Sequence, residues 1–150
     1  MHEVIRLSIE SVRSGIGGPF AALIVKDGVI LSKGTNLVTS MNDCTAHAEI
    51  VAIREACKTL GSFRLDGCEM YASCEPCPMC LGAIYWSRLS RIFFAGTRED
   101  ATRAGFDDSL IYSELAKPFG KRKIPTVQML HEESLAAFDE WRKKADKIEY

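Results

Sequence analysis

Apolar residues recur along this chain at two spacings, and the two spacings alternate from one end to the other. Helical spacing predicts helices over residues 1–13, 45–60, 76–87, 109–117 and 133–148. Short apolar runs predict strands at 20–25, 29–31, 68–72, 91–95 and 126–130. The first two runs flank the turn Lys26-Asp27-Gly28, which favours a hairpin. The stretches 37–44 and 96–108 have the composition of loops.

This order of elements indicates an α/β protein. Strand–helix–strand units favour parallel neighbours, whereas the leading hairpin adds an antiparallel pair. We therefore expect a mixed five-stranded sheet with helices on both faces, in which 91–95 is buried and the last helix turns Leu135, Phe138, Trp141 and Ala145 inward. At 150 residues the chain is long enough for one domain with a real core, and we expect that domain to span 1–150.

Composition narrows the classes of function. Apolar residues make up 47% of the chain and charged residues 26%, with a net charge of −1, so a dedicated nucleic-acid binder is disfavoured. Charged residues interrupt the first helix, which argues against a signal peptide, and no apolar run approaches membrane-spanning length. Without a secretory signal, six cysteines favour reduced thiols and metal binding over disulfides. We expect a cytoplasmic protein that does not contact membranes.

Three residues have the types and spacing of zinc ligands. Cys77 and Cys80, at i and i+3 of a helix start, can point at one ion, and the helix N-terminus favours their thiolates. His47, at the start of another helix, supplies a third ligand. The prolines at 76 and 78 fit the first turn of the helix. A fourth position would be left for water, whose pKa zinc lowers to about 7.

Glu49 lies two positions after His47, where its carboxylate can reach that water without binding the metal. It could take a proton from the water and pass it to a substrate nitrogen. A His-x-Glu motif followed by Pro-Cys-x-x-Cys is the pattern of zinc-dependent base deaminases.

A purely structural interpretation competes with this one. Cys-x-x-Cys alone is often a structural clip or a redox pair, and Cys74 with His47 would complete a closed Cys₃His site that holds no water. Against the closed site, Cys74 stands where a strand ends, and Glu49 would have no role. Cys44, Cys57 and Cys68 are expected to be ordinary core or boundary thiols.

Beyond the metal motif, the chain resembles the cytidine/deoxycytidylate deaminase superfamily, in particular its bacterial guanine deaminase branch. The resemblance rests on GIGGPFAALIVKDG, TAHAEI, MYASCEPCPMCLGAIYWSR, GFDDSLIY and the terminal IEY. It implies a three-layer α/β/α sandwich of the cytidine deaminase type, one Zn²⁺ per subunit, and conversion of guanine to xanthine and ammonia in purine catabolism or salvage. It also implies a homodimer in which a segment of about 131–150 is exchanged between subunits.

The same resemblance assigns roles to individual residues. His47, Cys77 and Cys80 would bind zinc, Glu49 would shuttle protons, and Asp108 would assist catalysis or hold the base. The other substrate contacts would come from Asn36, the Ala48 backbone and Tyr150. Independently of the resemblance, Phe20, Trp86 and Phe106 are aromatic residues that could stack on the base. Taken from position alone, Asn36 is equally a turn residue, Asp108 a helix N-cap and the aromatics core residues.

Other functions stay in competition at this point. The same chemistry could act on guanosine, or on adenosine in transfer RNA. A different class would be a non-catalytic zinc protein that binds nucleic acid through the basic stretches 121–123 and 142–144.

Overall fold

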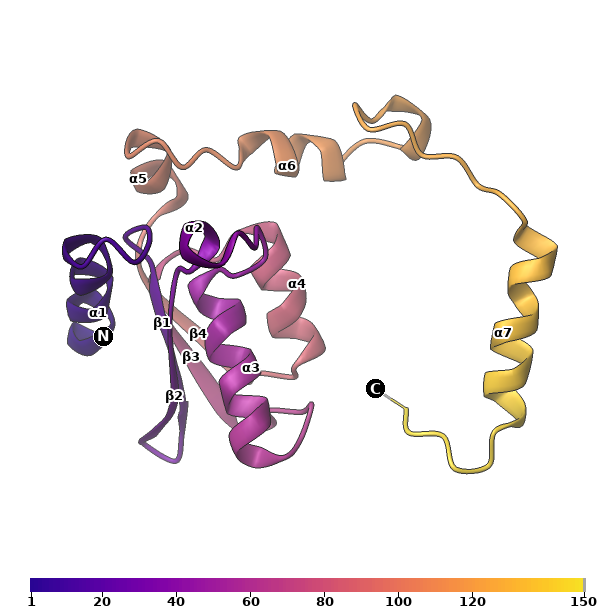
Figure 1. Ribbon diagram of the computed structural model, residues 1–150, viewed down its shortest axis with the longest axis horizontal. Coiled ribbons are helices and arrows are strands. Elements are labelled where there is room, and N and C mark those ends of the chain that lie inside the picture. Colours follow the sequence, from indigo (N-terminus) through magenta and orange to yellow (C-terminus); the bar gives the residue numbers. More distant parts are fainter. Residues whose placement is uncertain (150) are drawn as a thin grey trace. The chain divides into compact units, whose positions relative to one another are not determined.

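A four-stranded mixed sheet forms the centre of residues 1–108 in the computed structural model, which describes residues 1–149 (Figure 1). Its strands are β1 (Ala21–Lys26), β2 (Val29–Thr35), β3 (Cys68–Cys74) and β4 (Arg91–Gly96), in the spatial order β2-β1-β3-β4. β1 runs antiparallel to β2 and β3, whereas β3 and β4 are parallel. The mixed sheet is confirmed, but the prediction of five strands is wrong.

The hairpin between β1 and β2 closes through Asp27 and Gly28, whose φ angles are 50° and 78°. Two successive residues with positive φ make the turn type that matches the twist of paired strands, and Asp-Gly is a favoured sequence for it. The predicted turn is therefore confirmed; it pairs Lys26 with Val29, and an irregularity between Ile24 and Val25 then shifts the register so that Thr35 lies opposite Ala21.

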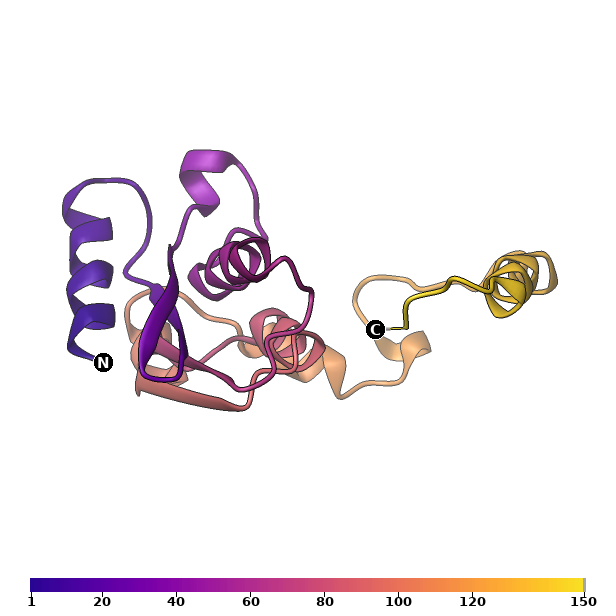
Figure 2. The ribbon, with the colours of Figure 1, turned by 90° about the horizontal axis from the view of Figure 1, so that it is seen from below.

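Helices cover both faces of this sheet. Helix α1 (His2–Arg13) lies on one side, and α3 (Ala48–Leu60) and α4 (Pro78–Trp86) lie on the other (Figure 2). On the α1 side, Val4 packs with Ala21 and Leu23 of β1. The larger core lies on the other side, where the residues buried between the sheet and α3 and α4 include Ile24, Ala52, Ala56, Met70 and Ile84. The α/β/α layering is thus confirmed.

Two short helices lie in stretches that the sequence assigns to loops. Helix α2 (Val38–Met41) ends at Asn42, which adopts the left-handed conformation. Helix α5 (Arg98–Arg103) begins with a capping box, in which Thr97 and Asp100 each bond the other's backbone N–H. Both helices belong to the unit Met1–Asp108.

The structure corrects three further expectations about burial and helix starts. Strand β4 is exposed or only partly buried at every position, because it is an edge strand. Helix α3 is capped by His47 rather than Thr45, and α4 starts at Pro78 rather than near residue 76.

The second unit, which starts at Ser109, contains α6 (Ser109–Leu115), the 3₁₀ turn η1 (Phe119–Lys121) and α7 (His131–Lys143). Residues 126–130, predicted as a strand, form neither strand nor helix. An alternating apolar pattern becomes a strand only when a neighbouring strand supplies hydrogen bonds. Val127 and Met129 are each 77% exposed, and Leu135, Phe138 and Trp141 of α7 are exposed rather than inward.

The organisation of residues 1–150 as one deaminase domain stays a prediction, since the chain divides into these two units. Among residues 1–149, no helix combines the length and the apolar character that crossing a membrane requires.

Candidate metal centre and active site

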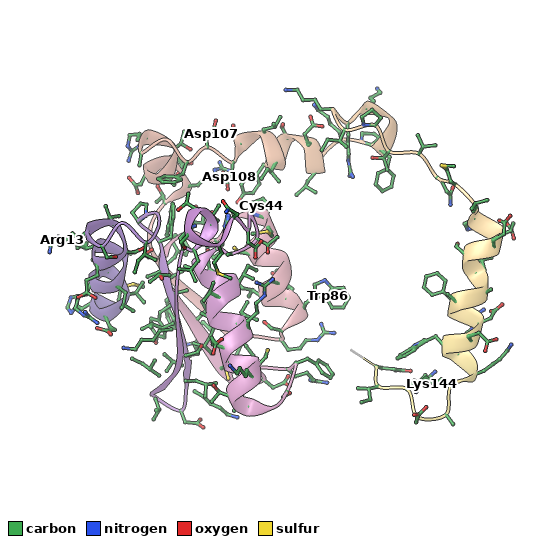
Figure 3. The ribbon with its side chains drawn as sticks, viewed as in Figure 1. Arg13, Cys44, Trp86, Asp107, Asp108 and Lys144 are labelled. Atoms are coloured by element: carbon green, nitrogen blue, oxygen red, sulfur yellow. The ribbon has the colours of Figure 1, made fainter. Side chains whose placement is uncertain are left out.

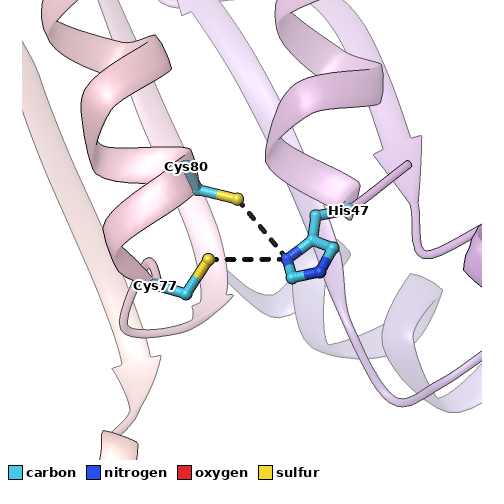
Figure 4. Close-up of side chains that lie close together, drawn as sticks. All are labelled: His47, Cys77 and Cys80. Atoms are coloured by element: carbon cyan, nitrogen blue, oxygen red, sulfur yellow. Dashed lines mark hydrogen bonds between the residues drawn. The ribbon is translucent and has the colours of Figure 1, made fainter. Parts of the chain in front are cut away.

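Two helix N-termini bring the predicted metal ligands together. His47 is the N-cap of α3 and Cys77 the N-cap of α4, and each has an extended backbone. The carbonyl of His47 accepts the first helical bond from Val51, and that of Cys77 accepts from Leu81. Cys80 follows in the first turn of α4, so that two sulfurs and one imidazole face one another (Figure 4).

The distances among these three side chains fit a tetrahedral zinc ion. His47 Nδ1 lies 3.6 Å from the Sγ atom of Cys77 and 3.6 Å from that of Cys80. With Zn–S about 2.3 Å and Zn–N about 2.05 Å, tetrahedral angles place nitrogen and sulfur about 3.5 Å apart. His47, Cys77 and Cys80 are the group among the described residues whose ligand atoms could hold a metal ion, all within 4.8 Å of one another. Three protein ligands leave a fourth position, as in catalytic rather than structural zinc sites.

The two sulfurs share one negative charge. A hydrogen bond from the Cys80 thiol is the largest influence that lowers the pKa of Cys77, to about 4, with a further contribution from His47. The same bond, together with burial, raises the pKa of Cys80. The Cys77 thiolate in turn raises the pKa of His47. A thiolate beside a second sulfur and an imidazole nitrogen suits a divalent cation.

Glu49 is buried beside the metal ligands, with 8% of its surface exposed. It occupies the first turn of α3, two residues after His47. Burial is the main cause that raises the pKa of its carboxyl group, and its interaction with the Cys80 sulfur places it at the same site. A carboxyl group whose proton is held more tightly than usual is suited to proton transfer near neutral pH.

Cys74 takes no part in the cluster. Its thiol donates a hydrogen bond to the carbonyl of Thr97 at 3.4 Å, which fixes it against the segment that caps α5. The closed Cys₃His arrangement is therefore not the one that the side chains adopt. Cys57 is half-buried and Cys68 is buried, as expected of boundary and core thiols, whereas Cys44 is exposed and does not fit that expectation.

The structure supports both interpretations of Asn36. Its Oδ1 accepts a hydrogen bond from the backbone N–H of Val38 at 3.2 Å, as a turn residue would. Its own backbone N–H donates to the carbonyl of Phe20 at 3.1 Å. Asn36 is thereby held at the end of β2, while its amide NH₂ group remains a donor that a substrate could use.

Phe20 and Phe106 form an edge-to-face pair, with ring centroids 4.9 Å apart. Phe20 also packs on the core, as the default interpretation of an aromatic residue expects, whereas Phe106 is 44% exposed. Their contact joins the start of β1 to the loop that carries Asp107 and Asp108.

Asp108 has an unused acceptor. Its Oδ1 atom is buried without a hydrogen-bond partner among the described residues, which is costly unless something else fills it. Burial is the first cause that raises the pKa of Asp108, and the negative charge of Cys77 is the second. An N-cap role would leave this oxygen free for another partner.

One predicted substrate contact, Trp86, is not brought to the cluster. Trp86 ends α4, nine residues along the helix from its start, and projects outward with 64% of its surface exposed (Figure 3). At about 1.5 Å per residue, it stands about 13 Å from the helix start that carries Cys77. Tyr150 lies outside the described residues. Both roles stay predictions.

Asp43, in the loop before His47, is a residue near the site that the sequence patterns did not single out. Asp43 Oδ1 accepts hydrogen bonds from both the backbone N–H and the hydroxyl of Thr45, at 2.8 and 2.7 Å. These bonds hold the loop that leads into His47 and lower the pKa of Asp43. The sequence signal for it is Asp-x-Thr at residues 43–45, separated from the metal-binding His47 by one residue.

Residues 1–96, which contain all three candidate ligands and Glu49, match the family model of the cytidine and deoxycytidylate deaminase zinc-binding region. The chain belongs to this deaminase family. Zinc is therefore the ion that the His47, Cys77 and Cys80 group is expected to hold, in agreement with its distances.

Within the family, the chain is similar along its whole length to a guanine deaminase from Bacillus subtilis. The two are 55% identical over 150 residues, which cover 100% of this chain and 96% of the relative. A crystal structure of guanine deaminase from the same organism superimposes with a TM-score of 0.97, covering 99% of this chain and 95% of that one.

Two further similarities are weaker or shorter. A guanine deaminase structure from Nitrosomonas europaea is 34% identical with a TM-score of 0.67, covering 71% of this chain and 62% of that one. A tRNA-specific adenosine deaminase from Aquifex aeolicus is 48% identical over 77 residues, 51% of each protein. That match therefore spans only about half of either protein.

Proposed function

We propose that this protein is a zinc-dependent guanine deaminase, which converts guanine and water to xanthine and ammonia. The observation that carries the proposal is the tetrahedral spacing of His47, Cys77 and Cys80 beside buried Glu49, in a chain 55% identical to a guanine deaminase from end to end.

The chemistry starts from a poor electrophile, because amide resonance stabilises the guanine ring. Zinc, when bound, lowers the pKa of a water molecule toward 7 and so supplies a strong nucleophile at neutral pH. Glu49 takes the proton that the attacking water loses and delivers it to ring nitrogen 3, which makes carbon 2 open to attack. The raised pKa of Glu49 fits a group that holds a proton between the two transfers.

The second half of the reaction is loss of ammonia from the tetrahedral carbon. The exocyclic nitrogen must gain a proton before the carbon–nitrogen bond breaks. That proton comes from the new hydroxyl group on carbon 2, and Glu49 can carry it to the exocyclic nitrogen. Asp108 can assist, because its raised pKa also favours the protonated form. The carbon–oxygen double bond of xanthine then forms as ammonia leaves.

Base recognition is assigned to polar groups around the same site. The Ala48 backbone N–H lies in the first turn of α3, where helices leave N–H groups without a helical partner. Asn36 can donate through its amide, and the buried Oδ1 of Asp108 can accept from a ring N–H. Phe20 and Phe106 would contact the face of the purine, and Trp86 and Tyr150 are proposed as further pocket residues.

We also propose a homodimer in which a segment of about 131–150 is exchanged between subunits. Large apolar side chains are exposed in both units, among them Tyr85, Trp86 and Phe94 in the first and Val127 and Phe138 in the second. Exposed apolar surface of this kind is typical of interfaces. Light scattering coupled to gel filtration tests the dimer; a mass of one chain across micromolar concentrations would contradict it.

Free thiols support a location in the cytoplasm, and the proposed reaction supports a place in purine catabolism or salvage. All six cysteines are free, as expected where thiols stay reduced. Fractionation of cells that carry a tagged copy tests the location, and recovery of the protein outside the cytoplasm would contradict it.

Ammonia release tests the reaction. Guanine, guanosine, adenine, cytosine and a transfer RNA that contains the target adenosine are each supplied to the zinc-loaded protein. We expect turnover of free guanine far above the others and its loss after treatment with a chelator. No turnover of guanine would overturn the proposal, and turnover of the transfer RNA alone would favour an RNA deaminase like the Aquifex relative.

A further inference from the structure

The loop that delivers His47 to the metal centre is held by one carboxylate. Asp43 Oδ1 accepts from the Thr45 backbone N–H at 2.8 Å and from the Thr45 hydroxyl at 2.7 Å. Two short hydrogen bonds to a charged acceptor are among the stronger ones that a partly exposed loop can make. They fix the backbone of Thr45 relative to Asp43.

The constraint passes to His47 through the backbone. The Thr45 carbonyl accepts a hydrogen bond from the His47 N–H at 2.8 Å, and the Asp43 carbonyl accepts from the Ala46 N–H at 3.0 Å. The Ala46 carbonyl accepts from Leu37 at 2.9 Å, which ties the loop to the end of β2. The position of Thr45 therefore constrains the backbone of the loop up to His47.

Arg54 connects the same loop to the helix that follows it. Its Nη2 lies 3.5 Å from the Thr45 hydroxyl and its Nη1 lies 3.8 Å from Asp43 Oδ2. The Arg54 side chain is 59% exposed, so its ion pair contributes little. The carboxylate of Asp43 is therefore the part of the network that matters most.

We propose that Asp43 is a positioning residue for the metal centre, which holds the His47 imidazole at the distance from Cys77 and Cys80 that zinc requires. A tetrahedral site tolerates only a few tenths of an ångström in ligand position. Loss of a partner hydrogen-bonded directly to a metal ligand typically weakens metal binding 10- to 100-fold. Because Asp43 acts on His47 through the backbone, the lower end of that range is expected. The proposal rests on the zinc-binding role of His47 in the proposed function.

Zinc affinity of the full-length chain tests the proposal, measured by competition with a chelator of known affinity. We expect Asp43→Ala to bind zinc at least about tenfold more weakly than the unaltered protein. Asp43→Asn, whose amide oxygen can accept the same two bonds, should recover most of that loss. Thr45→Val, which removes only the hydroxyl donor, should lose less than Asp43→Ala.

Asp66→Ala is the matched control. Asp66 is another partly exposed aspartate paired with an arginine, since Arg64 Nε donates to it at 2.8 Å, but it precedes β3 rather than a metal ligand. Its zinc affinity should equal that of the unaltered protein. The visible absorption of the Co²⁺-substituted protein should change in Asp43→Ala and not in Asp66→Ala, because those bands report ligand geometry and not stability.

Three results would overturn the proposal: zinc affinity of Asp43→Ala within twofold of the unaltered protein, an equal loss in Asp66→Ala, or no recovery in Asp43→Asn. Zinc binding is measured without substrate, so failure here is separate from failure of guanine turnover. A protein that binds zinc as expected but releases no ammonia from guanine would leave the role of Asp43 intact.

Discussion

The backbone of Gly34 on β2 lies directly against Ala48 on α3. A Cβ atom at position 34 would stand 2.2 Å from the Ala48 carbonyl oxygen and 2.6 Å from the Ala52 backbone nitrogen. Ser32, two residues earlier, donates to the Ala52 carbonyl at 2.7 Å. The start of α3, which His47 caps, therefore packs directly against the backbone of β2.

Gly34→Ala is expected to lower the free energy of unfolding by at least about 1–3 kcal/mol, because the new methyl group meets backbone that cannot move aside locally. It should also weaken zinc binding, since α3 must shift away from β2. Gly82→Ala is the control, because a Cβ atom there meets nothing within 4 Å. In helix α4 that change should be neutral or stabilising by up to about 1 kcal/mol. Urea unfolding measures both; equal stability of the two variants would contradict the close packing.

Glu49→Gln should keep zinc and the fold but lose about 10²- to 10⁴-fold in the rate of guanine deamination. The amide has the shape of the protonated carboxyl group but cannot carry a proton. Glu55→Gln, at an exposed position of the same helix, serves as control and should keep full activity. Ammonia release and metal analysis on the same preparations decide the matter, and a normal rate in Glu49→Gln would remove its proposed role.

Cys74→Ser should retain one zinc ion per chain, whereas Cys77→Ser and Cys80→Ser should lose it. The reason is that the Cys74 thiol is committed to the Thr97 carbonyl and the other two sulfurs face His47. X-ray absorption on the zinc protein should show two sulfurs, one nitrogen and one oxygen. Three sulfurs and one nitrogen would instead point to the closed structural site.

Glu3 gives the stability a pH dependence. Hydrogen bonds from Arg6 and then Lys33 lower its pKa from 4.5 to about 2, and the Lys33 bond joins α1 to β2. Because the pKa is lower in the folded protein, the stabilisation is complete above pH 4.5 and is lost as the pH falls toward 2.

The melting temperatures of metal-free wild type and Glu3→Gln should therefore differ by a constant amount from neutral pH down to about 5 and converge below that. Glu140→Gln removes a partner of Lys143 within one helix and should leave the melting temperature unchanged. A gap that persists undiminished at pH 3 would exclude the Glu3 carboxylate as its origin.

Removal of Glu149 and Tyr150 should reduce guanine turnover more than stability. The family resemblance assigns the terminal tyrosine to the substrate pocket, and two terminal residues contribute little to a folded core. Turnover and melting temperature of the truncated chain are compared with those of the full chain. An unchanged rate would mean that the tail does not cover the substrate.

Local patterns in the sequence were sufficient for most of the fold. Apolar runs predict the four strands of the sheet to within a few residues, and the Asp-Gly turn predicts their first pairing. The capping box at Thr97 and Asp100 could also have predicted α5, because the Thr-x-x-Asp pattern is visible in the sequence. Residues 126–130 have a strand pattern but no strand beside them, and a pattern cannot supply a partner.

The metal ligands could also be predicted from local sequence patterns, whereas the roles of the residues around them could not. Cys77 and Cys80 are one helical turn apart, so their sequence spacing fixes their spatial spacing. His47 joins them across 30 residues, which only a known motif could indicate. The unused oxygen of Asp108 and the loop bonds of Asp43 depend on how separate segments pack, and no local spacing records that.

Zinc would also link two segments of the chain, because His47 and Cys77 lie 30 positions apart in the sequence. An ion that binds the folded chain and not the unfolded one stabilises the fold by mass action, by about 2.7 kcal/mol when free zinc is 100 times its dissociation constant. Removing zinc should then lower the melting temperature as well as stop turnover. Availability of the metal would thereby control how long the protein survives, in addition to whether it works.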